Sequence, residues 1–169
     1  MPSIEDRLRA IEDRLEIYNL IASHPPGADT GADYFSRAAY IAEGMIDLGG
    51  GKTAEGNETV AAMVKTPGHQ AAIAGGLAHF AGLPLVEIDG DSATAFSYLQ
   101  ILTPHPSAEP HEVPNHGVSK GFRIHRVGAN RWDLVRTDAG WKIKRRTLRS
   151  LDGSEPAREL LRGALASYL

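Results

Sequence analysis

The 169 residues of this chain include seven histidines and no cysteine. The side chains that we consider for chemistry are therefore histidines, carboxylates and tyrosines. Without cysteine, disulfides, thiolate nucleophiles and cysteine metal sites are all excluded. His105, His111 and His116 stand close to Glu109 and Glu112, a composition that can bind a metal ion. Their spacing matches no compact ligand motif, and prolines spread them along an expected loop. We therefore predict no metal ion and no other cofactor.

Two further patterns indicate no phosphate or nucleic-acid partner. Gly51-Lys52-Thr53 matches the end of a phosphate-binding loop, but Ile46 occupies the position where that motif requires its first glycine, so we interpret the stretch as a turn. A net charge of −3 gives no electrostatic case for binding nucleic acid. The basic run from Lys142 to Arg149 is typical of the solvent-exposed face of a strand.

Two tyrosines could contact a substrate. Tyr18 is predicted on the core face of the first helix, and Tyr98 on a strand. A phenol hydroxyl that faces a pocket could donate a hydrogen bond to a substrate oxygen. The alternative for both residues is a packed tyrosine whose hydroxyl is satisfied elsewhere.

These residues must be positioned by helices in the N-terminal half of the chain. Ser3 and Asp6 match a capping box. Apolar residues then recur at helical spacing on one predicted core face, at Ile4, Leu8, Ile11, Leu15, Tyr18 and Ala22. The predicted helices cover residues 4–23, 33–43, 57–74 with a break near Pro67-Gly68, and 156–169. The first helix is predicted to end at His24-Pro25-Pro26-Gly27, and the loop after it holds Asp29.

Strands are expected in the second half of the chain. The clearest signal is a hairpin over residues 130–149, where Trp141, Ile143 and Arg145 alternate with other residues after a turn at 137–140. The other predicted strands cover residues 43–51, 77–89, 92–102 and 117–127. Residues 103–115 contain four prolines and are predicted to form a loop.

This order of elements predicts an α+β fold in one domain, with helices on one face of a bent antiparallel sheet. A sheet that curls around a helix leaves a cone with an open mouth. The interior of such a cone is a natural pocket for a small molecule.

Three segments in order carry a resemblance to a known family: EDRLEIYNLIASH, LAHFAGLPLVEIDGDSATAFSYL and NRWDLVRTDAGWKIKRR. Over residues 4–151 the chain resembles the NTF2-like superfamily, and within it the SnoaL-like branch of polyketide cyclases, scytalone dehydratase and hexachlorocyclohexane dehydrochlorinase. The resemblance implies a cystatin/NTF2-like cone, with a curved antiparallel sheet wrapped around the N-terminal helices. It implies a single domain over residues 1–169, of which 152–169 form a C-terminal helical extension.

In the dehydratase and dehydrochlorinase members, an Asp after the first helix and a His at the start of a later strand form a dyad. The resemblance places this dyad at Asp29 and His79, with Asp33 as an open alternative to Asp29. It implies that His79 is the general base and that Asp29 orients it. Arg131 and Trp132 lie where the family lines its pocket, so substrate binding is implied for them, with a surface arginine as the alternative for Arg131.

The activity implied by the resemblance is that of a cofactor-independent lyase or isomerase acting on a hydrophobic cyclic small molecule, as a dehydratase, dehydrohalogenase or double-bond isomerase. The alternative is a non-catalytic ligand-binding or assembly domain, like the small subunit of ring-hydroxylating dioxygenases. The family also implies a homo-oligomer, a dimer or trimer formed through the outer sheet face. No signal core or membrane-spanning stretch is present, so we expect a cytoplasmic protein without a membrane partner.

Overall fold

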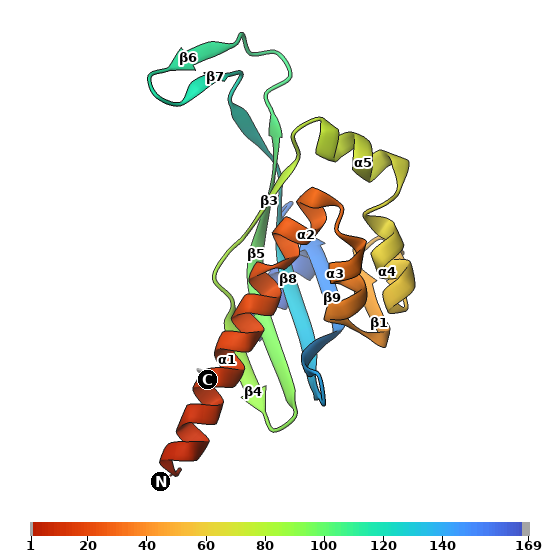
Figure 1. Cartoon of the computed structure of the whole chain (residues 1–169), viewed down its shortest axis with the longest axis vertical. Helices are drawn as coiled ribbons and strands as arrows, with labels where there is room; N and C mark the ends of the chain where they lie inside the picture. Colours follow the sequence, from red (N-terminus) through yellow and green to blue (C-terminus); the bar gives the residue numbers. More distant parts are fainter. Residues whose placement is uncertain (1, 167–169) are drawn as a thin grey trace.

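The computed structural model describes residues 2–166 of the chain (Figure 1). The helices are α1 (Ile4–Ala22), α2 (His24–Thr30), α3 (Asp33–Ala39), α4 (Asn57–Met63), α5 (Pro67–Ala74) and α6 (Glu155–Gly163). The strands are β1 (Tyr40–Asp47), β2 (Thr53–Glu55), β3 (Ala78–Ala81), β4 (Leu85–Asp89), β5 (Ser92–Pro104), β6 (His111–Val113), β7 (Gly117–Ser119), β8 (Phe122–Thr137) and β9 (Gly140–Ser150).

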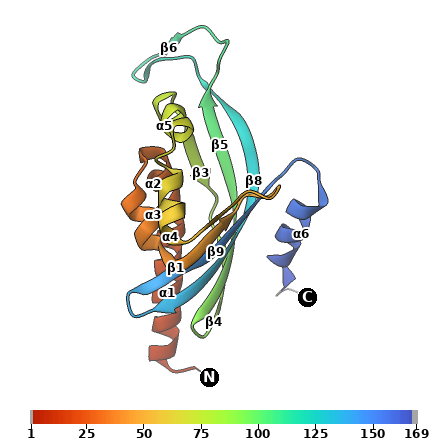
Figure 2. The ribbon, with the colours of Figure 1, turned by 90° about the vertical axis from the view of Figure 1, so that its right-hand side faces the viewer.

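One curved sheet forms the centre of the molecule (Figure 2). Its strand order is β2-β1-β9-β8-β5-β3, and β4 also pairs with β5. Helices α1 to α5 lie on one face, which we call the inner face, and α6 lies on the opposite, outer face (Figure 2). The predicted α+β cone is confirmed, with one difference from the predicted antiparallel sheet: β1 pairs with β9 in parallel.

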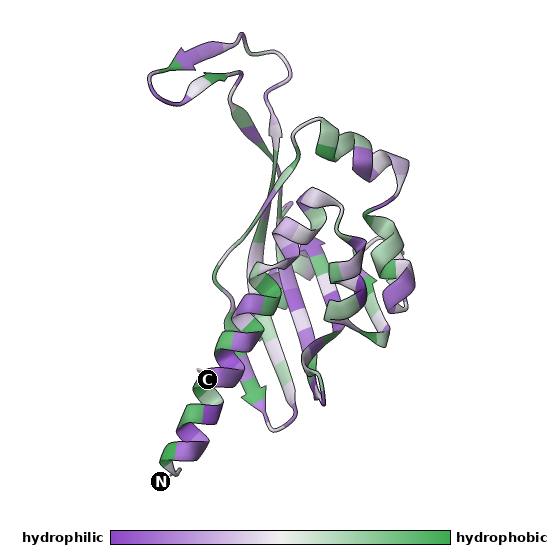
Figure 3. Ribbon diagram, viewed as in Figure 1, coloured by the Kyte–Doolittle hydropathy of each residue, from purple (hydrophilic) through white to green (hydrophobic). Residues whose placement is uncertain are grey.

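Helix α1 begins at the predicted capping box, where the hydroxyl of Ser3 accepts the backbone N–H of Asp6 at 3.0 Å. Figure 3 shows how hydrophobic and hydrophilic residues alternate along this helix. The predicted core stripe is wrong for five of its six residues, because Ala22 is exposed and four others are more than half exposed: Ile4, Leu8, Ile11 and Leu15. Ile17 and Ile21 are buried instead. No helix within residues 2–166 is both long enough and apolar enough to cross a membrane.

A polar network holds α1 against the sheet. The guanidinium of Arg136 donates two hydrogen bonds to the Asp13 carboxylate, at 2.6 and 2.7 Å, and the indole N–H of Trp141 donates a third at 3.0 Å. The Arg136 contact is the main reason why the pKa of Asp13 lies below its usual value. Glu16 accepts the backbone N–H of Trp141 at 2.7 Å. These contacts fix where α1 crosses β8 and β9.

The segment after α1 differs from the prediction. Pro25 and Pro26 were expected to end a helix in a loop, but they stand in the first turn of α2, where a missing backbone N–H costs nothing. Helix α2 ends at Gly31, whose φ of 65° is the left-handed conformation that glycine adopts without strain. The next helix, α3, is shorter than predicted, because β1 already begins at Tyr40.

The remaining elements follow the prediction with smaller differences. The break in the third predicted helix is confirmed, since α4 and α5 are separate helices and α5 begins at Pro67. The strand predicted over 77–89 is divided into β3 and β4. Part of the predicted proline-rich loop forms the β6–β7 hairpin, which projects from one end of the sheet (Figure 1). Residues 167–169 of the last predicted helix lie outside the described residues.

Candidate active site

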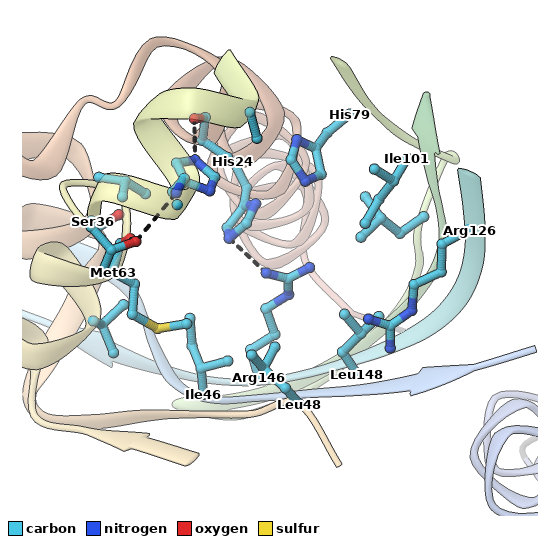
Figure 4. A pocket seen from close by; sticks show the side chains of 18 residues that line it. His24, Ser36, Ile46, Leu48, Met63, His79, Ile101, Arg126, Arg146 and Leu148 are labelled. Atoms are coloured by element: carbon cyan, nitrogen blue, oxygen red, sulfur yellow. Dashed lines mark hydrogen bonds between the residues drawn. The ribbon is translucent and has the colours of Figure 1, made fainter. Parts of the chain in front are cut away.

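A cavity of about 440 Å³ lies between the helices and the inner face of the sheet (Figure 4). Apolar side chains form most of its wall, among them Ile46, Met63, Leu99, Ile101 and Leu148. Its polar lining includes three histidines and two arginines, which come from α2, α5, β3, β8 and β9: His24, His69, His79, Arg126 and Arg146. The site therefore combines a hydrophobic enclosure with a small number of basic groups.

The Asp29 carboxylate holds His79 at two points. Asp29 Oδ1 lies 2.5 Å from His79 Nδ1, and Asp29 Oδ2 accepts the backbone N–H of His79 at 2.8 Å. A carboxylate accepts hydrogen bonds, so this contact places the proton of the neutral ring on Nδ1. Within residues 2–166, no group bonds to His79 Nε2, and the side chain of His79 is 11% exposed. A carboxylate-oriented imidazole with one free nitrogen thus lines the cavity.

The alternative carboxylate, Asp33, lies elsewhere. It begins α3 and forms ion pairs with Arg37 at 3.3 Å and with Lys65 at 3.2 Å. Asp29 contacts His79 because α2 packs against β3, the short strand that carries the histidine. The unpredicted helix therefore decides which aspartate faces His79.

His69, on α5, lies beside His79 in the same cavity. Its Nε2 is 2.8 Å from the backbone oxygen of Ala28, so Nε2 carries the proton and donates it. The rings of His69 and His79 are stacked, with centroids 6.5 Å apart. The sequence analysis assigns His69 no role, and the structure places it in the wall of this cavity.

Arg146, on β9, is a buried arginine in the cavity wall. Its Nε donates to Asn130 Oδ1 at 3.0 Å, its Nη1 lies 2.9 Å from His24 Nε2, and its guanidinium stacks 4.8 Å from the Trp132 ring centroid. Because an arginine can only donate, His24 must accept through Nε2 and carry its own proton on Nδ1. Burial is the main reason why the pKa of His24 lies well below 6.5, and the Arg146 charge lowers it further. His24 is thus a neutral acceptor at the start of α2, where the sequence predicted only the end of the first helix.

The prediction that the basic run around Arg146 is solvent-exposed is wrong for this residue, which is only 5% exposed. The cause is a β-bulge: Leu134 pairs with Ile143 and Asp133 pairs with Arg145, so Lys144 is an extra residue on β9. The bulge shifts the alternation, so Arg146 takes the inward position after Ile143 that strict alternation would give to Arg145.

A second bulge lies directly before Arg126 on β8. Ile101 pairs with Arg126 and Leu102 pairs with Ile124, which leaves His125 as the extra residue on β8. Arg126 therefore shares the inner face with Ile101 and lines the cavity. Its Nε is buried and has no hydrogen-bond partner in the described part of the chain.

The four predicted substrate-binding residues do not line this cavity. Tyr18 packs at the edge of the core beside Pro84, and Tyr98 is 52% exposed on the outer face. Arg131 also faces outward, where it forms an ion pair with Asp133 at 2.8 Å. Trp132 lies on the inner side but beneath Arg146, and its indole donates to Ser97.

The comparisons with known proteins agree with this architecture. The model of the SnoaL-like domain family matches residues 9–147, so the chain belongs to the SnoaL-like family. An NTF2-like protein with a cystatin-like fold from Novosphingobium aromaticivorans is 38% identical, covers 95% of this chain and 98% of its own, and superposes with a TM-score of 0.83. No curated protein matches the chain.

Two more distant structures from Novosphingobium aromaticivorans share the fold. One, provisionally named a scytalone dehydratase, is 15% identical over 88% of each chain, with a TM-score of 0.61. The other, provisionally named an aromatic ring hydroxylase, is 21% identical over 83% of this chain and 90% of its own, with a TM-score of 0.61. At these identities the likeness shows a common fold alone.

Proposed function

We propose that this protein is a cofactor-independent lyase or isomerase that acts on a hydrophobic cyclic small molecule. In this proposal His79 is the general base, and Asp29 fixes its tautomer and stabilises the imidazolium that forms. The observation that supports it most is the two-point contact of Asp29 with His79 beside a largely apolar cavity.

The chemistry requires one proton transfer. In an elimination, Nε2 takes a proton from carbon, the C–H electron pair forms the new double bond, and the leaving group departs with the electrons of its own bond. The imidazolium then protonates a departing hydroxide, which leaves as water, or gives its proton to solvent when a halide departs. In an isomerisation the same nitrogen returns the proton to a different carbon.

The cavity supports a ring-sized hydrophobic substrate. Its volume of about 440 Å³ lies in the range of small-molecule sites, and branched aliphatic side chains from β1, α4, β5 and β9 line it. A bound hydrophobic substrate would displace water from this wall, which would strengthen the electrostatic contact between Asp29 and the charged imidazole.

The proposal is tested with a panel of cyclic β-hydroxy ketones, halogenated cyclohexanes and cyclic β,γ-unsaturated ketones, followed by absorbance and by halide release. For any compound turned over, we expect His79→Gln to lower kcat by about 10²–10⁴-fold, because general base catalysis is lost. His111→Gln is the matched control, since His111 is exposed on β6. A folded His79→Gln enzyme with undiminished turnover would show that His79 is not the base.

A feature of the outer sheet face favours an assembly role beside or instead of catalysis. Five apolar residues face outward on β3, β4, β5 and β8 and are 46–59% exposed: Phe80, Leu85, Tyr98, Phe122 and Ile124. Several exposed apolar side chains gathered on one sheet face are typical of a protein interface. We propose that it joins copies of this chain into a dimer or trimer, and a purely structural subunit would use the same face.

A further inference from the structure

The cavity beside His79 contains cationic side chains without anionic ones. Figure 4 shows the guanidinium ends of Arg126 and Arg146 pointing into the space below His79. None of the 18 lining residues in the described part of the chain is an aspartate or glutamate. Asp29 does not line the cavity, and both of its carboxylate oxygens contact His79.

Neither arginine has a carboxylate partner within residues 2–166. Arg146 bonds only to the neutral groups of Asn130 and His24, and Nε of Arg126 has no partner at all. Four other arginines of the sheet differ, since they form ion pairs with aspartates: Arg131, Arg136, Arg145 and Arg149. Arg146 is the buried one of the two, at 5% exposed, and a buried guanidinium without a counter-ion is costly unless an anion binds there.

The charge of Arg126 also acts on Arg146. Burial is the main cause that lowers the pKa of Arg146, and the charge of Arg126 lowers it further. The Arg146 guanidinium therefore lies in a positive potential that an anion would relieve. Arginine binds planar carboxylates with paired, charge-assisted hydrogen bonds.

The positions of the arginines are built by the fold. Arg126 shares the inner face of β8 with Asn130 and Trp132 by unbroken alternation, and the β-bulge at Lys144 turns Arg146 on β9 to the same face. Bulges commonly re-aim a side chain beside an active site. Asn130 and Trp132 then hold the guanidinium of Arg146 from below, by a hydrogen bond and by stacking.

We propose that Arg126 and Arg146 form a carboxylate-binding subsite, so that the substrate is a hydrophobic acid whose carboxylate lies on this pair. That the reacting carbon of the acid lies near His79 rests on the proposed function. That the two arginines bind the carboxylate of the acid does not depend on it. The apolar ring of the acid would lie against Leu99, Ile101 and Leu148, between the arginines and the base.

The test compares 1-naphthoate with its neutral isostere 1-naphthamide by isothermal titration calorimetry. We expect the wild-type protein to bind the acid about tenfold or more tightly than the amide, because charge-assisted hydrogen bonds form only with the carboxylate. Arg126→Met should abolish this preference. Arg131→Met removes the same charge from the outer face and should keep it.

Equal affinity for the two compounds, no binding of 1-naphthoate at millimolar concentration, or an unchanged preference in Arg126→Met would overturn the proposal. Arg146→Lys, which keeps a charge but loses the planar fork, should reduce the preference if Arg146→Met does not fold. His79→Gln separates the two claims: it should retain the preference for the acid even though turnover is lost. If the preference for 1-naphthoate were lost in His79→Gln and kept in Arg126→Met, the carboxylate-binding subsite would be wrong, and the proposed role of His79 as a base would be unaffected.

Discussion

At the scale of single residues, the contact between Asp29 and His79 determines which nitrogen of the imidazole can act as a base. Nδ1 and the backbone N–H of His79 both contact the same carboxylate, so the ring cannot rotate without losing one of these bonds. The remaining nitrogen faces an apolar cavity in which a carbon acid could be held. Ring orientation and tautomer are therefore fixed by one side chain.

His24 gives a prediction about acid stability. Its folded pKa lies well below 6.5, so the unfolded chain binds a proton at this position at pH values where the folded chain does not. Stability from His24 is thus present above pH 6.5 and is lost as the pH falls below it. Between pH 7.5 and 5, we expect wild type to lose more unfolding free energy than His24→Asn. Urea unfolding at both pH values measures this difference, and parallel losses in the two proteins would show that His24 is not buried as a neutral ring.

At the scale of elements, α1 is held by a network centred on Asp13, which is 7% exposed. Removing this carboxylate leaves the indole N–H of Trp141 and the two terminal nitrogens of Arg136 without their acceptor, and Arg136 keeps only its contact through Nε with the exposed Asp91. We expect Asp13→Ala to lower the free energy of unfolding by about 2–3 kcal/mol. Glu12→Ala, at an exposed position next to it, should change stability by less than about 0.5 kcal/mol. Similar urea midpoints for the two variants would mean that the network does not anchor the helix.

Which site residues could be predicted from the sequence depended on whether the helices and strands that carry them were predicted. The pair of Asp29 and His79 was predicted through the family pattern, but the choice against Asp33 needed α2, which proline-rich sequences do not indicate by periodicity. Arg131 and Trp132 are neighbours on a strand and face opposite sides, so alternation alone already excludes that both line one pocket.

Arg126 could be placed by the same alternation, because no bulge separates it from Trp132 on β8. Arg146 could not, because it follows a bulge, and a bulge is visible only when both paired strands are known. A single extra residue reverses every later inward or outward assignment on its strand. The burial of Arg146 among other basic residues therefore follows from pairing, not from its local sequence.

At the scale of the whole molecule, two groups of apolar side chains are exposed to solvent. One is the outer sheet face with Phe80, Leu85, Tyr98, Phe122 and Ile124, and the other is the stripe of Ile4, Leu8, Ile11 and Leu15 on α1. The stripe has the spacing of a coiled-coil seam, four, three and four residues. The sheet face is the one that we propose to join copies of this chain, because it combines five side chains on adjacent strands.

We expect light scattering coupled to size-exclusion chromatography to give a dimer or trimer for the wild type. Ile124→Lys should dissociate it, because a charge would be buried in the interface. Leu8→Lys, on the other surface, should leave the mass unchanged. A monomeric wild type, or dissociation by Leu8→Lys alone, would rule out the sheet face as the interface.

The central claim is that Asp29 leaves Nε2 of His79 free to act as a base, and ¹⁵N NMR of the histidine rings at a pH where imidazole is neutral tests it most directly. The account predicts that His79 carries its proton on Nδ1 in the wild type, and that Asp29→Asn weakens or reverses this preference because an amide can also donate. A wild-type His79 with its proton on Nε2 would contradict the account, since the lone pair needed for proton abstraction would then face Asp29.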